Sequence, residues 1–211
     1  MHMNIDMPPR LKPPSKEVSQ LLPDFDILSE SDIFIPQTPA EFAQAREVLL
    51  AQTVLGFDTE SKPLFKVGEV DTGPHIVQLA STQAAWILQL HHSQALALAA
   101  EILNSDSICK IGFGLQHDTA SLPKRLGMAL NNVVDLDRVF KRHGYIASVG
   151  VRGAVALVLG QNFHKSKRQS TSNWAKKQLN EAQIRYAAND AHAPAAVYAA
   201  LPAWEAMQES M

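Results

Sequence analysis

The chain has 211 residues, of which 46% are hydrophobic and 19% are charged, and its formal net charge is −2. This length and apolar content predict one globular domain with a sizeable core. We find no apolar run long enough for a bilayer and no secretory leader, so we expect a cytoplasmic protein without a membrane partner. The single cysteine, Cys109, excludes an internal disulfide, and its apolar surroundings in the sequence predict a buried structural thiol.

Charge is unevenly distributed along the chain. Residues 138–180 contain nine Lys or Arg residues and no Asp or Glu, whereas the remainder carries ten basic and twenty-one acidic residues. A segment of +9 in a background of −11 favours a local surface for a polyanion. The alternative is a solvated helical face.

Residues 1–30 contain five prolines and show no sustained apolar periodicity. This composition predicts an N-terminal arm that is extended or partly disordered. We expect the globular domain to span residues 31–211.

Strands and helices alternate after this arm. The hydrophobic spacing, capping residues and turn signals predict an α/β domain with a mixed, mostly five-stranded sheet and helices on both faces. The second to fourth apolar runs suggest an antiparallel meander, and the fifth is expected to join in parallel after a helix. Expected strands are at 33–35, 53–58, 75–80, 85–90, 108–113 and 133–135, and expected helices at 39–51, 94–103, 118–126, 137–143, 151–159 and 180–200.

Two carboxylates follow the apolar run at 53–57. Asp58 and Glu60 are two residues apart, so on a strand they face the same side. Carboxylates that face one point repel each other unless a cation lies between them, and a hard divalent cation with oxygen ligands is the usual solution. The alternative is a strand that simply runs out into a polar loop.

Further carboxylates occur in two later segments. Asp118 ends the stretch Gly112-Phe113-Gly114-Leu115-Gln116-His117-Asp118, and Asp190 lies one helical turn after Tyr186. With Phe57-Asp58-Thr59-Glu60, these segments resemble the DEDD superfamily of 3′–5′ exonucleases, from about residue 31 to the C-terminus. The tyrosine four residues before Asp190, with Arg185 rather than a histidine before it, is similar to the branch of ribonuclease D and Werner-type exonuclease domains.

The resemblance implies a ribonuclease H-like fold and a 3′–5′ exonuclease that releases nucleoside 5′-monophosphates. It implies that two divalent cations are held by the four carboxylates and that Tyr186 orients the attacking water or accepts its proton. Two such ions stabilise the attacking and leaving oxygens of a phosphodiester together. Oxygen ligands suit Mg²⁺ or Mn²⁺ better than Zn²⁺. The implied ligands are Asp58, Glu60, Asp118 and Asp190.

Substrate contacts are also implied by the resemblance. Ser61 and Leu64 match positions near the terminal nucleotide, and Gly114 leaves only backbone for contact at its position. The basic segment could bind backbone phosphates without sequence preference, or it could be merely a soluble loop. Its candidate residues are Lys165, Lys167, Arg168 and Lys176. The expected partner is single-stranded or 3′-ended nucleic acid, with DNA and RNA both open.

Two other functions compete with this interpretation. One is a catalytically weak relative that only binds nucleic acid, which should have lost at least one of the five key side chains. The other is a metal-dependent phosphatase for small phosphate esters, against which the +9 segment favours a polymer.

Overall fold

The computed structural model describes residues 11–65 and 67–210, so the first ten residues of the predicted arm lie outside the described part. The fold is α/β with one mixed sheet, as predicted. The sheet has six strands rather than mostly five, because the two-residue β1 pairs in parallel with the edge of β4. In spatial order the strands are β1 (Ile33–Phe34), β4 (Ala85–Gln89), β3 (Ile76–Ala80), β2 (Val54–Glu60), β5 (Cys109–Gly112) and β6 (Val133–Asp135).

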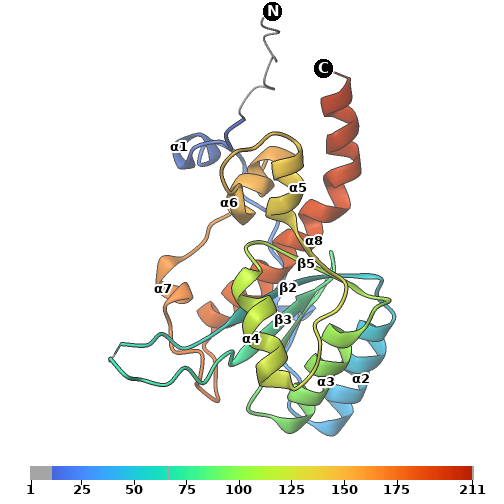
Figure 1. The fold of residues 1–211 in the computed structure, drawn as a ribbon, viewed down its shortest axis with the longest axis vertical. Helices are drawn as coiled ribbons and strands as arrows, with labels where there is room; N and C mark the ends of the chain where they lie inside the picture. Colours follow the sequence, from blue (N-terminus) through green and yellow to red (C-terminus); the bar gives the residue numbers. More distant parts are fainter. Residues whose placement is uncertain (1–10, 66, 211) are drawn as a thin grey trace, which may run out of the picture.

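Helices cover both faces of this sheet (Figure 1). On one face, Phe57 and Leu79 pack with Phe42 of α2 and Leu98 of α3. The other face lies against the long helix α8. The helices are α1 (Lys16–Ser19), α2 (Pro39–Leu50), α3 (Ser93–Asn104), α4 (Gln116–Leu126), α5 (Leu136–Arg142), α6 (Gly150–Ala154), α7 (Lys167–Ser170) and α8 (Glu181–Glu209), with the 3-10 turn η1 (Glu30–Asp32) and the π-helical turn η2 (Val155–Leu159).

The sheet pairs as the sequence predicts. β2, β3 and β4 form an antiparallel meander, in which Asp58 lies opposite Gln78. β5 joins β2 in parallel after α3. Because side chains alternate along a strand, Asp58, Glu60 and Gln78 share the face on which α8 packs.

α8 lies unusually close to the sheet at one point. A Cβ atom on Gly56 would be only 1.9 Å from the backbone oxygen of Ala191. Glycine is therefore required at this position in β2, because any side chain would push the helix away. This close approach brings the N-terminal half of α8 over the end of β2.

Helix starts follow the expected chemistry, whereas one helix end does not. Capping boxes form at Thr38 and Asn180. α8 runs to Glu209 instead of ending near residue 200, passing through Pro194 and Pro202. Its C-terminal half is stabilised by packing against α5 and α6, and this tertiary burial outweighs the lost backbone hydrogen bonds.

One burial prediction is wrong. Cys109 begins β5 and is partly rather than fully buried. Trp86 and Trp174 lie in the core.

The described part of the arm packs along the domain. Phe25 and Leu28 are buried in two core clusters that include α8. The backbone N–H of Leu28 donates to Asn189 Oδ1 of α8 at 3.1 Å. Within residues 11–65 and 67–210, no helix has both the length and the apolar character needed to cross a membrane.

Candidate active site

Three carboxylates meet where β2 ends beneath α8. Asp58 and Glu60 project from the strand, and Asp190 projects from the helix. One oxygen from each lies within 4.8 Å of the other two. The structure thus brings together residues that are more than 120 positions apart in the sequence.

Burial and mutual repulsion disfavour negative charge in this carboxylate cluster (Asp58, Glu60 and Asp190). Burial, followed by the charge of Asp58, raises the pKa of Glu60 to about 9. Burial and the facing Asp190 raise the pKa of Asp58, and burial raises that of Asp190. Such a cluster is stable in its charged form only with a compensating cation.

One lysine already supplies part of this compensation. Lys165, predicted as a contact to the nucleic-acid backbone, instead places its Nζ 3.0 Å from Asp190 Oδ2. Burial alone would lower the pKa of Lys165, but the charges of Asp190 and Asp58 outweigh it and raise the pKa. The same ammonium lies 5.8 Å from the centre of the Tyr186 ring.

Tyr186 lies beside the cluster, one turn before Asp190. Its ring packs 5.9 Å from Trp174, and its buried hydroxyl has no partner that meets hydrogen-bond geometry in the described part of the chain. Burial and the charge of Asp190 raise the pKa of Tyr186 far above its ordinary value. The phenol therefore keeps its proton and is suited to orienting a water molecule.

Asp118 lies next to the cluster without joining it. This buried residue is in the first turn of α4, and its carboxylate accepts a short hydrogen bond from the Thr59 hydroxyl. That bond ties α4 to the strand that carries Asp58 and Glu60. Asp118 is not among the carboxylates within 4.8 Å of one another in the described residues.

The sequence interpretation missed Gln78. This residue of β3 is fully buried, and neither its Oε1 nor its Nε2 has a hydrogen-bond partner among the described residues. It lies opposite Asp58 and on the same face. Its signal was a lone polar residue in the apolar run from Ile76 to Ala80.

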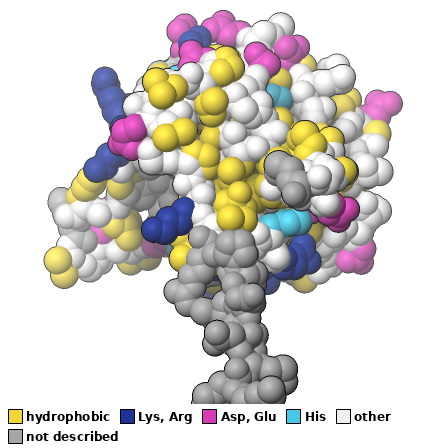
Figure 2. Space-filling view, turned by 90° about the horizontal axis from the view of Figure 1, so that it is seen from above, with side chains coloured by type: hydrophobic (Ala, Val, Ile, Leu, Met, Phe, Trp, Pro, Cys, Tyr) yellow, Lys and Arg dark blue, Asp and Glu magenta, His cyan; other side chains and the backbone are white. Residues whose placement is uncertain are grey.

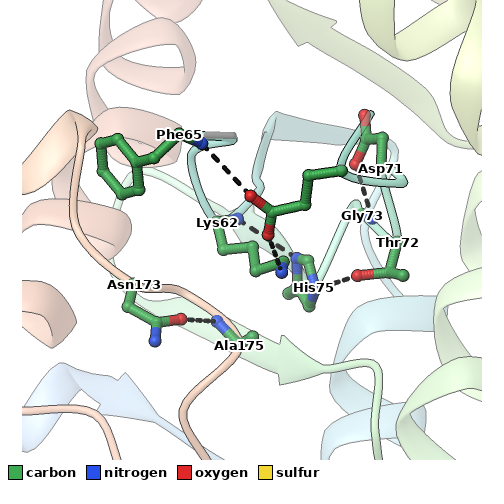
Figure 3. Close-up of polar contacts among 9 residues, drawn as sticks. Lys62, Phe65, Asp71, Thr72, Gly73, His75, Asn173 and Ala175 are labelled. Carbon is green, nitrogen blue, oxygen red and sulfur yellow. Dashed lines mark hydrogen bonds and ion pairs between the residues drawn. The ribbon is translucent and has the colours of Figure 1, made fainter. Parts of the chain in front are cut away.

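Ser61 and Leu64 lie on the loop between β2 and β3, which leaves the strand that carries Asp58 and Glu60. Ser61 follows β2 directly, and Leu64 is 44% exposed. Figure 3 shows that the loop is held by contacts among its own residues. One of these contacts is the ion pair between Lys62 and Glu69, at 2.6 Å. The segment at Asn173 lies across from this loop in the same view.

The remaining predicted substrate contacts lie outside the carboxylate cluster. Gly114 has a φ of +66°, and its N–H donates to Asp135 Oδ1 at 3.2 Å, so this N–H is already used within the protein. Lys167 and Arg168 are exposed on α7, and Lys176 is exposed further along. Their contact with nucleic acid stays a prediction.

The residues present fit a divalent metal. Their donor atoms are carboxylate oxygens, which suit Mg²⁺ or Mn²⁺. Asp190 is 3% exposed, and neither of its oxygens has a partner with hydrogen-bond geometry in the described chain, although Oδ2 is ion-paired with Lys165. Oxygens left in this state are the expected ligands of a cation.

A six-stranded mixed sheet that carries acidic residues at the end of a central strand, under a facing helix, is the fold of ribonuclease H-like exonuclease domains. The family model described as 3′–5′ exonuclease matches residues 33–203. The chain belongs to this family.

Individual relatives support this family assignment. The chain is 26% identical over 199 residues to the exonuclease mut-7 homolog of Aedes aegypti, covering 82% of this chain and 27% of that protein. It is 30% identical over 150 residues to the bifunctional 3′–5′ exonuclease/ATP-dependent helicase WRN of Mus musculus, covering 69% and 10%. The crystal structure of the Aedes aegypti Nibbler EXO domain shares the fold, with a TM-score of 0.71, 24% identity, and coverage of 84% and 90%. The chain thus spans only a minor part of these two curated relatives.

Proposed function

We propose that the chain is a metal-dependent 3′–5′ exonuclease that hydrolyses phosphodiester bonds at the 3′ end of nucleic acid. The observation that carries this proposal is the meeting of Asp58, Glu60 and Asp190 within 4.8 Å, beside Tyr186, in a chain of this family. We assign the activity to residues 31–211, with the arm as a packed support.

Divalent cations bound in the cluster would acidify the attacking water and stabilise the leaving oxygen. Asp58, Glu60 and Asp190 are the side chains that would hold them. Asp118, whose carboxylate accepts a hydrogen bond from Thr59 of the same strand as Asp58 and Glu60, would be a further ligand. Tyr186 orients the water through its buried hydroxyl, which lies beside the Asp190 carboxylate. The raised pKa of Tyr186 argues against its acting as the base.

The product expected from cleavage at the 3′ terminus is a nucleoside 5′-monophosphate. We assign contact with the terminal nucleotide to Ser61 and Leu64, and the exposure of Leu64 supports this assignment. The basic segment on the other side favours a polymeric anion over a small phosphate ester. The exposed candidates there are Lys167, Arg168 and Lys176.

The direct test uses matched DNA and RNA oligonucleotides labelled at the 5′ end, with Mg²⁺ or Mn²⁺. We expect a ladder that shortens from the 3′ end and disappears in Asp58→Ala. Glu47→Ala, on the exposed face of α2, removes a carboxylate away from the cluster and should keep the ladder. If the unaltered chain shortens neither polymer with either metal, the proposal is wrong.

A further inference from the structure

A second, basic pocket adjoins the carboxylate cluster. We propose that this pocket binds a phosphate group of the nucleic-acid strand, next to the bond that is cleaved. The inference rests on the proposed function for its substrate, but it concerns residues to which that function assigns no role. Lys16 and Gln20 of α1 form one wall, Arg152 of α6 forms another, and residues 162–166 close it.

The lining of this basic pocket suits an anion. Its volume is 310 Å³, which is room for roughly ten water molecules and hence for a phosphodiester group with part of its hydration. Three of its side chains are cationic (Lys16, Arg152 and Lys165), and Asn162 and Gln20 add amide groups. No acidic residue lines it within the described chain.

Two of the cations have no ion-pair partner in the described part of the chain. Across residues 11–65 and 67–210, no carboxylate lies within ion-pair distance of Lys16 or Arg152. Arg152 is half-buried, so the pocket holds its charge away from full solvation. Cations gathered in a concave site without ion-pair partners attract an anion, and phosphate is the anion of the proposed substrate.

The pocket is built by contacts between the arm and the 162–166 loop. The N–H of Asn162 donates to the carbonyl of Pro23 at 2.8 Å, and the N–H of Phe25 donates to the carbonyl of Asn162 at 3.0 Å. His164 pairs with Asp24 at 2.8 Å, so the Asp24 carboxylate is bonded to His164 rather than to one of the cations of the pocket. In Figure 2, which views the molecule from above, several Lys and Arg side chains project on the left of the picture. This is the side on which α1 and α7 lie in Figure 1.

Lys165 connects the pocket to the carboxylate cluster. It lines the basic pocket while its ammonium pairs with Asp190. A divalent cation held by the carboxylates competes with this ammonium, which then becomes available to a phosphate in the pocket. The bound phosphate therefore lies within one lysine side chain of the site of cleavage.

The pocket is not a property of the family segment alone. The family match begins at residue 33, whereas Lys16 and Gln20 come from the arm that precedes it. The arm thus adds a phosphate contact to an exonuclease domain.

The test measures binding of a fluorescent single-stranded oligonucleotide in the presence of chelator, so that no turnover occurs. The slope of log K against log salt is negative, and removing one cation that neutralises a phosphate of a single strand reduces its magnitude by about 0.7. We expect Lys16→Gln and Arg152→Gln each to weaken binding and to make the slope shallower by about this amount, with a larger loss in the double variant. Lys16→Arg should restore both quantities.

Arg46→Gln is the matched control, because Arg46 pairs with Glu101 on the exposed surface of α2 and α3. It should change neither affinity nor slope, and melting temperatures verify that all variants fold. Unchanged affinity and slope in both Lys16→Gln and Arg152→Gln would overturn the proposal. So would a thermal shift by inorganic phosphate that Arg152→Gln abolishes while oligonucleotide binding is kept, since the pocket would then serve a free anion.

This measurement is separate from the test of the exonuclease itself. Loss of the basic pocket with a persistent 3′ ladder would leave the proposed function standing. A slope change without any ladder would support the pocket in a protein that binds nucleic acid without cleaving it.

Discussion

The ammonium of Lys165 lies against the same carboxylate that a metal ion would need, with Nζ 3.0 Å from Asp190 Oδ2. We expect Lys165→Met to destabilise the metal-free protein by about 1–3 kcal/mol, less than for a fully buried ion pair because the lysine is partly exposed. The rise in melting temperature on adding Mn²⁺ should become larger, since the ion no longer competes with an ammonium. An equal or smaller rise would contradict this competition.

The charge of the cluster predicts how stability depends on pH. Because the pKa of Glu60 is raised from 4.5 to about 9, the folded protein keeps a proton that the unfolded chain has released between these values. The free energy of unfolding of the metal-free protein should therefore fall as pH rises through this window. Urea unfolding at several pH values measures it. Glu60→Gln should flatten the dependence, and stability that rises across the window would contradict it.

Tyr186→Phe tests the role of the phenol. The ring keeps its packing against Trp174, so the melting temperature should change little. We expect turnover to fall by about 10²- to 10⁴-fold with KM nearly unchanged. Trp174→Phe is the contrast, because its main effect should be a lower melting temperature. Full turnover in Tyr186→Phe would show that the hydroxyl does not act on the water.

Gln78 and Gln89 form a matched pair of buried amides on neighbouring strands. Gln78 has no partner in the described chain, whereas Gln89 Nε2 donates to the carbonyls of Lys176 and Lys177 at 3.2 Å. Gln78→Leu should stabilise the metal-free protein by about 1–3 kcal/mol, and Gln89→Leu should destabilise it by a similar amount.

Metal titration distinguishes the role of Gln78 further. We expect its amide to support the cluster beside Asp58, so Gln78→Leu should weaken metal binding by about 10- to 100-fold. Calorimetric titration with Mn²⁺ measures this directly. Unchanged affinity would mean that the buried amide has no part in the metal site.

Gly56→Ala tests the close packing of α8 on the sheet. The added Cβ would meet the backbone oxygen of Ala191, so we expect a loss of stability at or above the about 1–3 kcal/mol typical of overpacking. Truncating the nearby side chain with Ala195→Gly should not rescue the variant, because the obstructing atom belongs to the backbone. Rescue by Ala195→Gly would show that side-chain crowding dominates instead.

The sequence predicted the strands well, because their signals are local. Asp58 and Glu60 share a face through the two-residue repeat of a strand, and Tyr186 and Asp190 share one through the helical repeat. That these two pairs meet follows from topology, and it required the resemblance to a known family.

The remaining features depend on contacts between distant segments. The segment around Lys165 has no periodicity, so nothing local indicates that its ammonium reaches Asp190. The hydrogen bond from Thr59 to Asp118 joins a strand to a helix. The length of α8 was underestimated because prolines lower helix propensity, while burial of residues such as Trp204 overrides it.

The packed arm affects how this protein can be shortened. Phe25 and Leu28 fill the core beside α8. The backbone N–H of Leu28 also donates a hydrogen bond to the side chain of Asn189, one residue before Asp190. A truncated chain that begins at the family boundary, residue 33, would therefore expose apolar surface on the helix that bears Asp190. Such a fragment could lose activity through loosened packing, with every one of its predicted catalytic side chains still present.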